Sequence, residues 1–165
     1  MSNIYLIGFM GCGKSTLAKN LAEALNMHCM DLDQLIEAKA GQSIRELFDE
    51  KGEEYFRDLE TYYLKETSNL KNTIVSTGGG AVGREVNRQF LKAQMTFYLE
   101  WPFEVLYSRI AGDEKRPLSK SYEQLLELYQ YRRALYEESA VYTIGCQDET
   151  PYLLVKKIIK LLQEK

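Results

Sequence analysis

Residues 8–16 read Gly-Phe-Met-Gly-Cys-Gly-Lys-Ser-Thr, and this stretch decides the fold. It fits the pattern of a glycine, four variable residues, and then Gly-Lys followed by Ser or Thr. A short apolar run of strand type, residues 4–7, comes before it, and leucines at positions 17, 21 and 25 mark one face of a helix after it. Strand, glycine loop and helix in this order predict a loop that wraps the phosphates of a nucleoside triphosphate.

The residue types in this phosphate loop (residues 8–16) suit phosphate chemistry. The glycines let the backbone curl so that its N–H groups point at phosphate oxygens, and the helix start adds the positive end of its dipole. We expect Lys14 to reach the β- and γ-phosphates and the Ser15 hydroxyl to hold Mg²⁺. The expected nucleotide-binding residues of the loop are Gly11, Cys12, Gly13, Lys14, Ser15 and Thr16.

Length, charge and hydropathy argue against several classes of protein. The chain has 165 residues, and we expect residues 1–165 to form one domain. A net charge of −3 argues against a general nucleic-acid binder. No apolar run approaches the ~20 residues of a membrane span, and the apolar N-terminal stretch lacks a basic region and breaks at Gly8. We therefore expect neither a membrane span nor a signal peptide.

The cysteines argue against a zinc site. Cys12, Cys29 and Cys146 are far apart in the chain, and His28 is its only histidine, so a zinc ion would have too few ligands. Three unpaired thiols suit a reducing cytoplasm, which is where we expect the protein to be. Cys12 is most simply explained as a small residue that fills a variable position of the phosphate loop.

Apolar segments and helical patterns alternate along the rest of the chain. Further strands are expected at residues 28–31, 73–77, 95–100 and 141–144, and helices between them. Ser43 and Glu46 form the sequence pattern of a capping box, and an aromatic stripe (Tyr55, Phe56, Leu59, Tyr62, Tyr63) is expected to face the core. The alternation predicts an α/β protein with a parallel sheet covered on both faces, whose ligands gather at the carboxyl ends of the strands.

Two aspartates follow the second expected strand. If the segment stays extended, Asp31 and Asp33 point to the same side, so that one can serve a metal and the other an acceptor hydroxyl. N-capping of a helix by Asp33 is an alternative. A GTP-dependent switch is a second alternative, but the chain lacks Asn-Lys-x-Asp, and residues 49–52 (Asp-Glu-Lys-Gly) lie at the end of a helical pattern rather than after a strand.

Further landmarks follow in order: Phe56-Arg57, Ser76-Thr77-Gly78-Gly79-Gly80, Arg116-Pro117-Leu118 and Arg132 to Tyr136. With the phosphate loop and Asp31-Leu32-Asp33, they make nearly the whole chain resemble the shikimate kinases. Gluconate kinase, which also acts on a hydroxylated carboxylate, is the nearest alternative, and a nucleoside monophosphate kinase is a more distant one. Two positions depart from the usual pattern, Ser119 after the Arg-Pro-Leu run and Ala134 before Leu-Tyr.

The resemblance implies a three-layer P-loop kinase fold with a five-stranded parallel sheet in the order 2-3-1-4-5, substrate-binding helices at about 33–62 and a short lid at about 112–121. It implies Mg²⁺-dependent transfer of the γ-phosphoryl group of ATP to the 3-hydroxyl of shikimate, by a monomer that acts on small molecules. The implied catalytic residues are Lys14, Asp33 and Arg116. Those implied to bind shikimate are Asp33, Arg57, Gly78, Gly79, Gly80 and Arg132. Arg109, Arg116 and Pro151 are implied to bind ATP, with the adenine held between Arg109 and Pro151. Ser15 and, through water, Asp31 are implied to bind the metal.

The chemistry of these residues agrees with that role. Planar guanidinium groups at Arg57 and Arg132 can grip a carboxylate with two parallel hydrogen bonds, which a lysine cannot do. Glu60, three residues after Arg57, is expected to hold that arginine in position. A surface charge is the alternative for any single arginine, and Arg133 is expected to be such a case.

Overall fold

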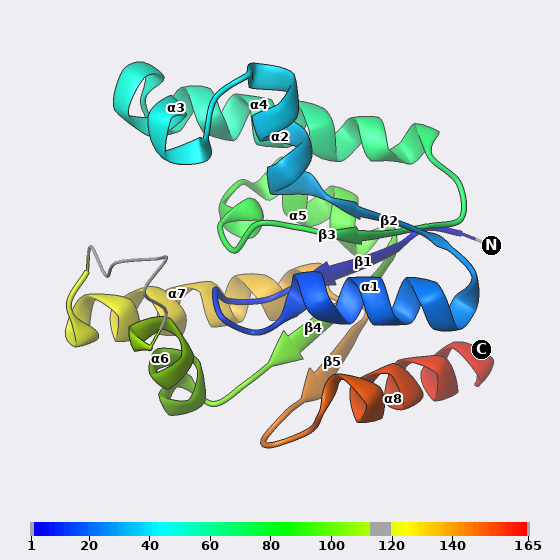
Figure 1. Cartoon of the computed structure of the whole chain (residues 1–165). Coiled ribbons are helices and arrows are strands. Elements are labelled where there is room, and N and C mark those ends of the chain that lie inside the picture. Colours follow the sequence, from blue (N-terminus) through cyan, green and yellow to red (C-terminus); the bar gives the residue numbers. More distant parts are fainter. Residues whose placement is uncertain (1, 113–119, 165) are drawn as a thin grey trace.

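The computed structural model describes residues 2–112 and 120–164 (Figure 1). Its centre is a five-stranded parallel sheet in the order β2-β3-β1-β4-β5. The strands are β1 (Ile4–Ile7), β2 (His28–Asp31), β3 (Thr73–Ser76), β4 (Met95–Glu100) and β5 (Tyr142–Gly145). The predicted sheet, its parallel pairing and its strand order are confirmed; β3 ends one residue earlier than predicted, and β5 is shifted by one residue toward the C-terminus.

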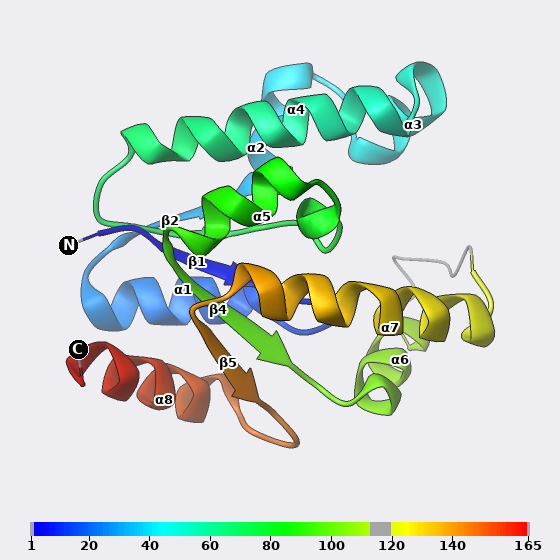
Figure 2. The ribbon, with the colours of Figure 1, turned by 180° about the vertical axis from the view of Figure 1, so that it is seen from behind.

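Helices cover both faces of the sheet, which gives three layers. The helices α1 (Lys14–Leu25) and α8 (Pro151–Gln163) lie on one face. Seen from behind, α5 (Glu85–Lys92) and α7 (Tyr122–Ser139) cover the other face (Figure 2). β1 is completely buried between them, since its four residues expose at most 1 % of their surface. An uninterrupted apolar strand of this kind requires cover on both faces, so the sequence of β1 matches its place in the middle of the sheet.

Three helices stand together beside the β2 edge of the sheet: α2 (Leu32–Ala40), α3 (Ile44–Lys51) and α4 (Glu53–Glu66) (Figure 1). The remaining elements are α6 (Phe103–Ala111) and two 3₁₀ turns, η1 (Thr67–Asn69) and η2 (Ala81–Gly83). Most of the predicted lid at 112–121, including Arg116 and Ser119, lies outside the described residues. None of the helices in the described ranges is long and apolar enough to cross a membrane.

The ends of α2 and α3 follow local sequence signals. Gly41 has φ +68°, in the left-handed region that favours glycine, and ends α2. Ser43 begins α3 as predicted, because its hydroxyl accepts the Glu46 amide at 3.1 Å. The predicted capping box is only half formed: the Glu46 carboxylate accepts from the Ser43 hydroxyl, also at 3.1 Å, rather than from the Ser43 amide.

The prediction that the whole aromatic stripe of α4 faces the core is wrong. Phe56 is buried, but Tyr55 is 44 % and Tyr62 57 % exposed. These two tyrosines are seven residues apart and share the outer side of the helix. The aromatic and apolar residues of α4 span a wider face than the one that packs against the core. One position on the packed face is occupied by the buried carboxyl group of Glu60.

Candidate active site

The phosphate loop follows β1 at the carboxyl edge of the sheet, and α1 begins at Lys14. Gly11 and Gly13 have φ of +80° and +83°, in the left-handed region where a side chain would strain the backbone. At Gly8, a β-carbon would lie 2.9 Å from Sγ of Cys12, so the loop folds back closely on its own start. The three glycines are therefore required for the curl that the motif predicts.

The Lys14 side chain lies inside the curl and is only 9 % exposed. Its ammonium group donates to the carbonyl oxygens of Gly8 at 2.6 Å and Phe9 at 3.4 Å. These carbonyls hold the positive charge at the mouth of the loop, beside the N-terminal end of α1. The helix dipole and the lysine thus present positive charge to one spot, which is the electrostatic requirement for binding polyphosphate.

The Ser15 hydroxyl donates to Oδ2 of Asp31 at 2.8 Å, which links the phosphate loop to the end of β2. The other carboxylate oxygen of Asp31 accepts the Gln34 amide at 3.1 Å and caps α2. The alternative that Asp33 is the helix cap is therefore wrong, because Asp31 has that role. Asp33 lies in the first turn of α2, and its side chain remains available to the site.

The turn at residues 78–80 follows β3, and each of its glycines lies beside at least one charged side chain. A β-carbon on Gly78 would lie 2.8 Å from Oδ1 of Asp33, one on Gly79 3.6 Å from Nη1 of Arg132, and one on Gly80 2.7 Å from Nη1 of Arg57. These side chains come from three different helices, α2, α7 and α4. Gly79 also faces the phosphate loop, with its hypothetical β-carbon 3.5 Å from the Met10 amide nitrogen. The predicted substrate-binding residues therefore meet at one place.

This packing gives a testable consequence at Gly80. Gly80→Ala is expected to raise the KM for the acceptor about tenfold or more with the KM for ATP unchanged, because a methyl group there displaces the Arg57 guanidinium. The Gly80 φ of −95° suits alanine, and the displaced group is the far end of a flexible side chain, so the fold should tolerate the change. Gly83→Ala in η2 is the matched control, since its β-carbon meets nothing within 4 Å. Steady-state kinetics with each substrate varied checks the prediction, and equal KM values for the two variants would contradict it.

The predicted contact between Arg57 and Glu60 is confirmed. Nη1 of Arg57 donates to Oε1 of Glu60 at 2.8 Å, and the Glu60 side chain is 1 % exposed. Glu53 approaches the same guanidinium at 3.7 Å. The buried Glu60 carboxylate orients the Arg57 guanidinium toward the glycine turn. A guanidinium group needs such a fixed orientation to give two parallel hydrogen bonds to a planar anion.

Two buried carboxyl oxygens in this site have no hydrogen-bond partner among the described residues, Oδ1 of Asp33 and Oε2 of Glu60. Both face the position of Gly78. Burial raises the pKa of both carboxyl groups, and the neighbouring Asp31 carboxylate raises the pKa of Asp33 further, against the opposing effect of Lys14. Unpartnered buried acceptors are costly, and here they are placed to receive hydroxyl hydrogens from a ligand.

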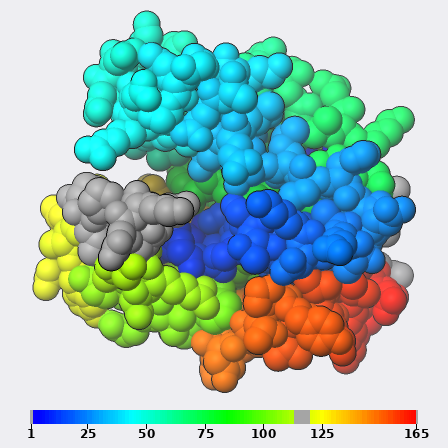
Figure 3. Space-filling view, viewed as in Figure 1, coloured from blue at the N-terminus to red at the C-terminus, as the bar shows by residue number. Residues whose placement is uncertain are grey.

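The phosphate loop, the two aspartates and the start of the glycine turn share a cavity of about 660 Å³. It is lined by residues 10–16 of the phosphate loop, by Asp31 and Asp33, and by Gly78, Gly79 and Arg109. In Figure 3 the blue surface of the N-terminal region lies between the cyan surface around α2 and α3 and the orange surface of the segment around the start of α8. The cavity thus contains the predicted metal pair, Ser15 and Asp31, together with the predicted base, Asp33.

The two residues implied to hold the adenine are placed differently. Arg109 lines the cavity, and its Nη1 donates to the Gly11 carbonyl at 3.1 Å. Pro151 is the first residue of α8 and does not belong to the described lining of this cavity. Arg133 pairs with Glu100 at 3.0 Å, away from the glycine turn, which agrees with its predicted role as a surface charge.

Sequence reasoning missed two aromatic residues that support the site. The Tyr136 hydroxyl donates to the Gly79 carbonyl at 2.6 Å and fixes the glycine turn from α7. The Arg109 guanidinium lies over the Trp101 ring, with its carbon 4.1 Å from the ring centroid. Tyr136 lies in the segment that the sequence analysis named because of Arg132. No local sequence pattern indicates, however, that its hydroxyl group bonds to a backbone carbonyl in a distant part of the chain.

Comparisons with known proteins agree with this geometry. A family model described as shikimate kinase matches residues 10–163. A shikimate kinase of Persephonella marina is 41 % identical over 161 residues, covering 96 % of this chain and 98 % of that protein. A shikimate kinase of a Sulfurihydrogenibium species is 38 % identical and covers both chains completely. A solved structure described as shikimate kinase from Acinetobacter baumannii in complex with shikimate has a TM-score of 0.92 at 38 % identity, covering 99 % of this chain and 94 % of that one. By sequence and by structure, the chain belongs to the shikimate kinase family.

Proposed function

We propose that this chain transfers the γ-phosphoryl group of ATP to the 3-hydroxyl of shikimate, a step toward chorismate and the aromatic amino acids. The observation that carries the proposal is the convergence of Asp33, Arg57 and Arg132 on the glycine turn, next to the phosphate loop. Shikimate is a small carboxylate with three hydroxyl groups. Two guanidinium groups match its carboxylate, and unpartnered carboxyl oxygens match its hydroxyls.

The residues of the phosphate loop position the donor. Loop amides and the start of α1 bind the β- and γ-phosphates, and Lys14 exchanges its loop carbonyls for phosphate oxygens. Because phosphoryl transfer has a loose transition state, positioning and charge stabilisation account for most of the catalysis. Arg116 is proposed to add positive charge at the transferring group. It lies outside the described residues, so its role rests on the family resemblance.

The described donors fit Mg²⁺ at Ser15. The Ser15 hydroxyl and the Asp31 carboxylate are oxygen donors 2.8 Å apart, and the described residues contain no cluster of three or more acidic, His or Cys side chains. One protein hydroxyl, a carboxylate acting through water, and phosphate oxygens make up a coordination that Mg²⁺ prefers over an all-protein cage. When bound, Mg²⁺ neutralises charge on the β- and γ-phosphates.

Asp33 is proposed to orient the 3-hydroxyl and accept its proton. Its unpartnered Oδ1 faces the glycine turn, and Lys14 is close enough to lower its pKa. The opposing effect of burial keeps this carboxylate more basic than an exposed aspartate, as a general base requires. The proton then leaves the hydroxyl late, as the oxygen forms its bond to phosphorus.

We further propose a single-domain, monomeric enzyme of the cytoplasm that acts on small molecules. The support is a sheet whose five strands form one continuous core with their helices, a net charge of −3, and free thiols at all three cysteines. The net charge is unsuited to general nucleic-acid binding.

An ADP-release assay tests the proposed function. With ATP and Mg²⁺, ADP should form rapidly when shikimate is present, and at a small background rate with no acceptor, with gluconate or with AMP. Turnover with gluconate in place of shikimate would favour the gluconate kinase alternative. Tight GTP binding without acceptor-dependent turnover would favour a switch protein instead.

A further inference from the structure

Trp101 and Arg109 form a cation–π pair at the border of the nucleotide site. The guanidinium carbon lies 4.1 Å from the centroid of the indole. Trp101 is 2 % exposed, whereas Arg109 is exposed and lines the cavity of the phosphate loop. The guanidinium thus lies over the buried indole, and the exposed part of Arg109 faces solvent and that cavity. Cation–π attraction is strongest with tryptophan among the aromatic residues.

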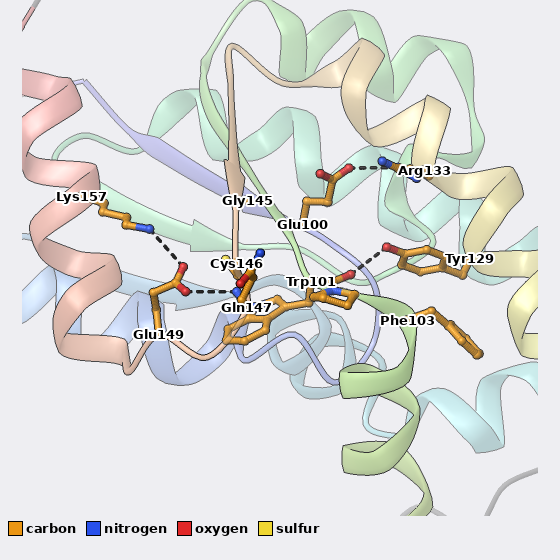
Figure 4. A pocket seen from close by; sticks show the side chains of 11 residues that line it. Glu100, Trp101, Phe103, Tyr129, Arg133, Gly145, Cys146, Gln147, Glu149 and Lys157 are labelled. Carbon is orange, nitrogen blue, oxygen red and sulfur yellow. Dashed lines mark hydrogen bonds and ion pairs between the residues drawn. The ribbon is translucent and has the colours of Figure 1, made fainter.

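The pair stands between two cavities. Trp101 lines a second cavity of about 620 Å³ at the ends of β4 and β5, together with Tyr129, Cys146 and Glu149 (Figure 4). Arg109 lines the cavity of the phosphate loop instead. Since Nη1 of Arg109 donates to the Gly11 carbonyl at 3.1 Å, the loop holds the edge of the guanidinium while the indole supports its face.

Trp101 is itself held firmly. Its carbonyl accepts from the Tyr129 hydroxyl at 2.7 Å (Figure 4), and the Tyr129 ring meets Phe9 of the phosphate loop edge to face, with centroids 5.4 Å apart. The indole nitrogen finds no hydrogen-bond partner among the described residues. Packing and the cation–π contact, rather than a hydrogen bond, therefore set the plane of the indole ring.

We propose that Trp101 is a positioning residue for the base of the nucleotide. It holds the Arg109 guanidinium flat, so that the open face of the guanidinium stacks on the adenine of ATP. The proposal rests on the nucleotide site described under the proposed function. Without the indole, Arg109 keeps its hydrogen bond to the Gly11 carbonyl but can turn about it, and the stacking surface is lost for part of the time.

Kinetics separate this role from a merely structural one. Trp101→Leu removes the aromatic face and is expected to raise the KM for ATP about three- to tenfold, with kcat and the KM for shikimate unchanged. Trp101→Phe keeps an aromatic face and should restore most of the difference. A structural defect would lower kcat or raise both KM values. An unchanged KM for ATP in Trp101→Leu, or a Phe variant as impaired as the Leu variant, would overturn the proposal.

A double-mutant cycle and fluorescence extend the test to binding alone. If Trp101 acts through Arg109, then Trp101→Leu should no longer weaken ADP binding, measured by calorimetry, when Arg109→Ala is already present. Because Trp101 is the only tryptophan of the chain, ADP should also change its fluorescence saturably in the unmodified protein without any acceptor. Additive effects in the cycle, or a fluorescence unchanged by saturating ADP, would overturn the proposal. Neither readout requires phosphorylation of shikimate. A failure of the proposed function would therefore be seen in the ADP-release assay and not in these two measurements.

Discussion

Asp33→Asn is expected to lower kcat about 10²- to 10⁴-fold while the affinity for ATP stays the same. The amide keeps the size and hydrogen-bonding capacity of the side chain but cannot take the proton of the acceptor hydroxyl. The phosphate loop bonds to Asp31 through Ser15 rather than to Asp33. Steady-state kinetics and ADP titration measure the two quantities. Asp58→Asn on the outer side of α4 is the control, because Asp58 is 65 % exposed and pairs only with Arg84 among the described residues.

The same substitution should stabilise the fold at neutral pH. Burial raises the pKa of Asp33 in the folded chain. As the pH rises through that pKa, the carboxyl group must ionise in an environment that disfavours the charge. The unmodified protein therefore loses stability relative to the variant over this pH range. Below the ordinary pKa of an aspartate the two proteins should differ little. Thermal unfolding across this range measures the difference. An unfolded variant would contradict the predicted gain in stability, and near-normal turnover of the folded variant would remove Asp33 from the mechanism.

Arg57→Lys is expected to raise the KM for shikimate about 10- to 100-fold, with the KM for ATP unchanged. Lysine keeps the positive charge, but an ammonium group cannot give two parallel hydrogen bonds to a carboxylate. The lysine can still pair with the buried Glu60 carboxylate, which would otherwise have no positively charged partner. The variant should therefore fold. Varying each substrate in turn with the other saturating measures this effect.

Arg84→Lys is the matched control for this change. Arg84 also pairs with carboxylates of α4, Glu54 and Asp58, both at 2.8 Å, but it does not touch the glycine turn that contacts Arg57. Its KM for shikimate should equal that of the unmodified protein. If the two variants behave alike, Arg57 contributes only to the surface charge of α4 and not to acceptor binding.

The sheet and the phosphate loop could be predicted because their signals are local. β1 is an unbroken apolar run that needs cover on both faces, and the glycines at positions 11 and 13 adopt backbone angles that few other residues accept. The rule that ligands gather at the carboxyl ends of parallel strands then placed the loop, the two aspartates and the glycine turn at one edge. The predicted pairing of Arg57 with Glu60 followed from helical spacing alone.

The parts that could not be predicted depend on contacts between distant segments. Helical spacing placed Tyr55 and Tyr62 on an apolar stripe, but only the packing of α4 shows that they face outward. Which of the two aspartates caps α2 depends on where β2 ends, because a helix that began two residues later would place Asp33 at the N-cap position. Trp101 belongs to no sequence motif, and its contact with Arg109 joins the residue that follows β4 to a residue near the end of α6.

The central claim is that two guanidinium groups hold the carboxylate of the acceptor, so that its hydroxyl lies at Asp33 beside the phosphate loop. The most direct measurement compares kcat/KM for shikimate with that for its methyl ester in the unmodified protein, by ADP release at saturating ATP and Mg²⁺. The ester keeps every hydroxyl group but carries no charge, and we predict a loss of about 100-fold or more, chiefly in KM. Equal kcat/KM values for the acid and the ester would contradict the account.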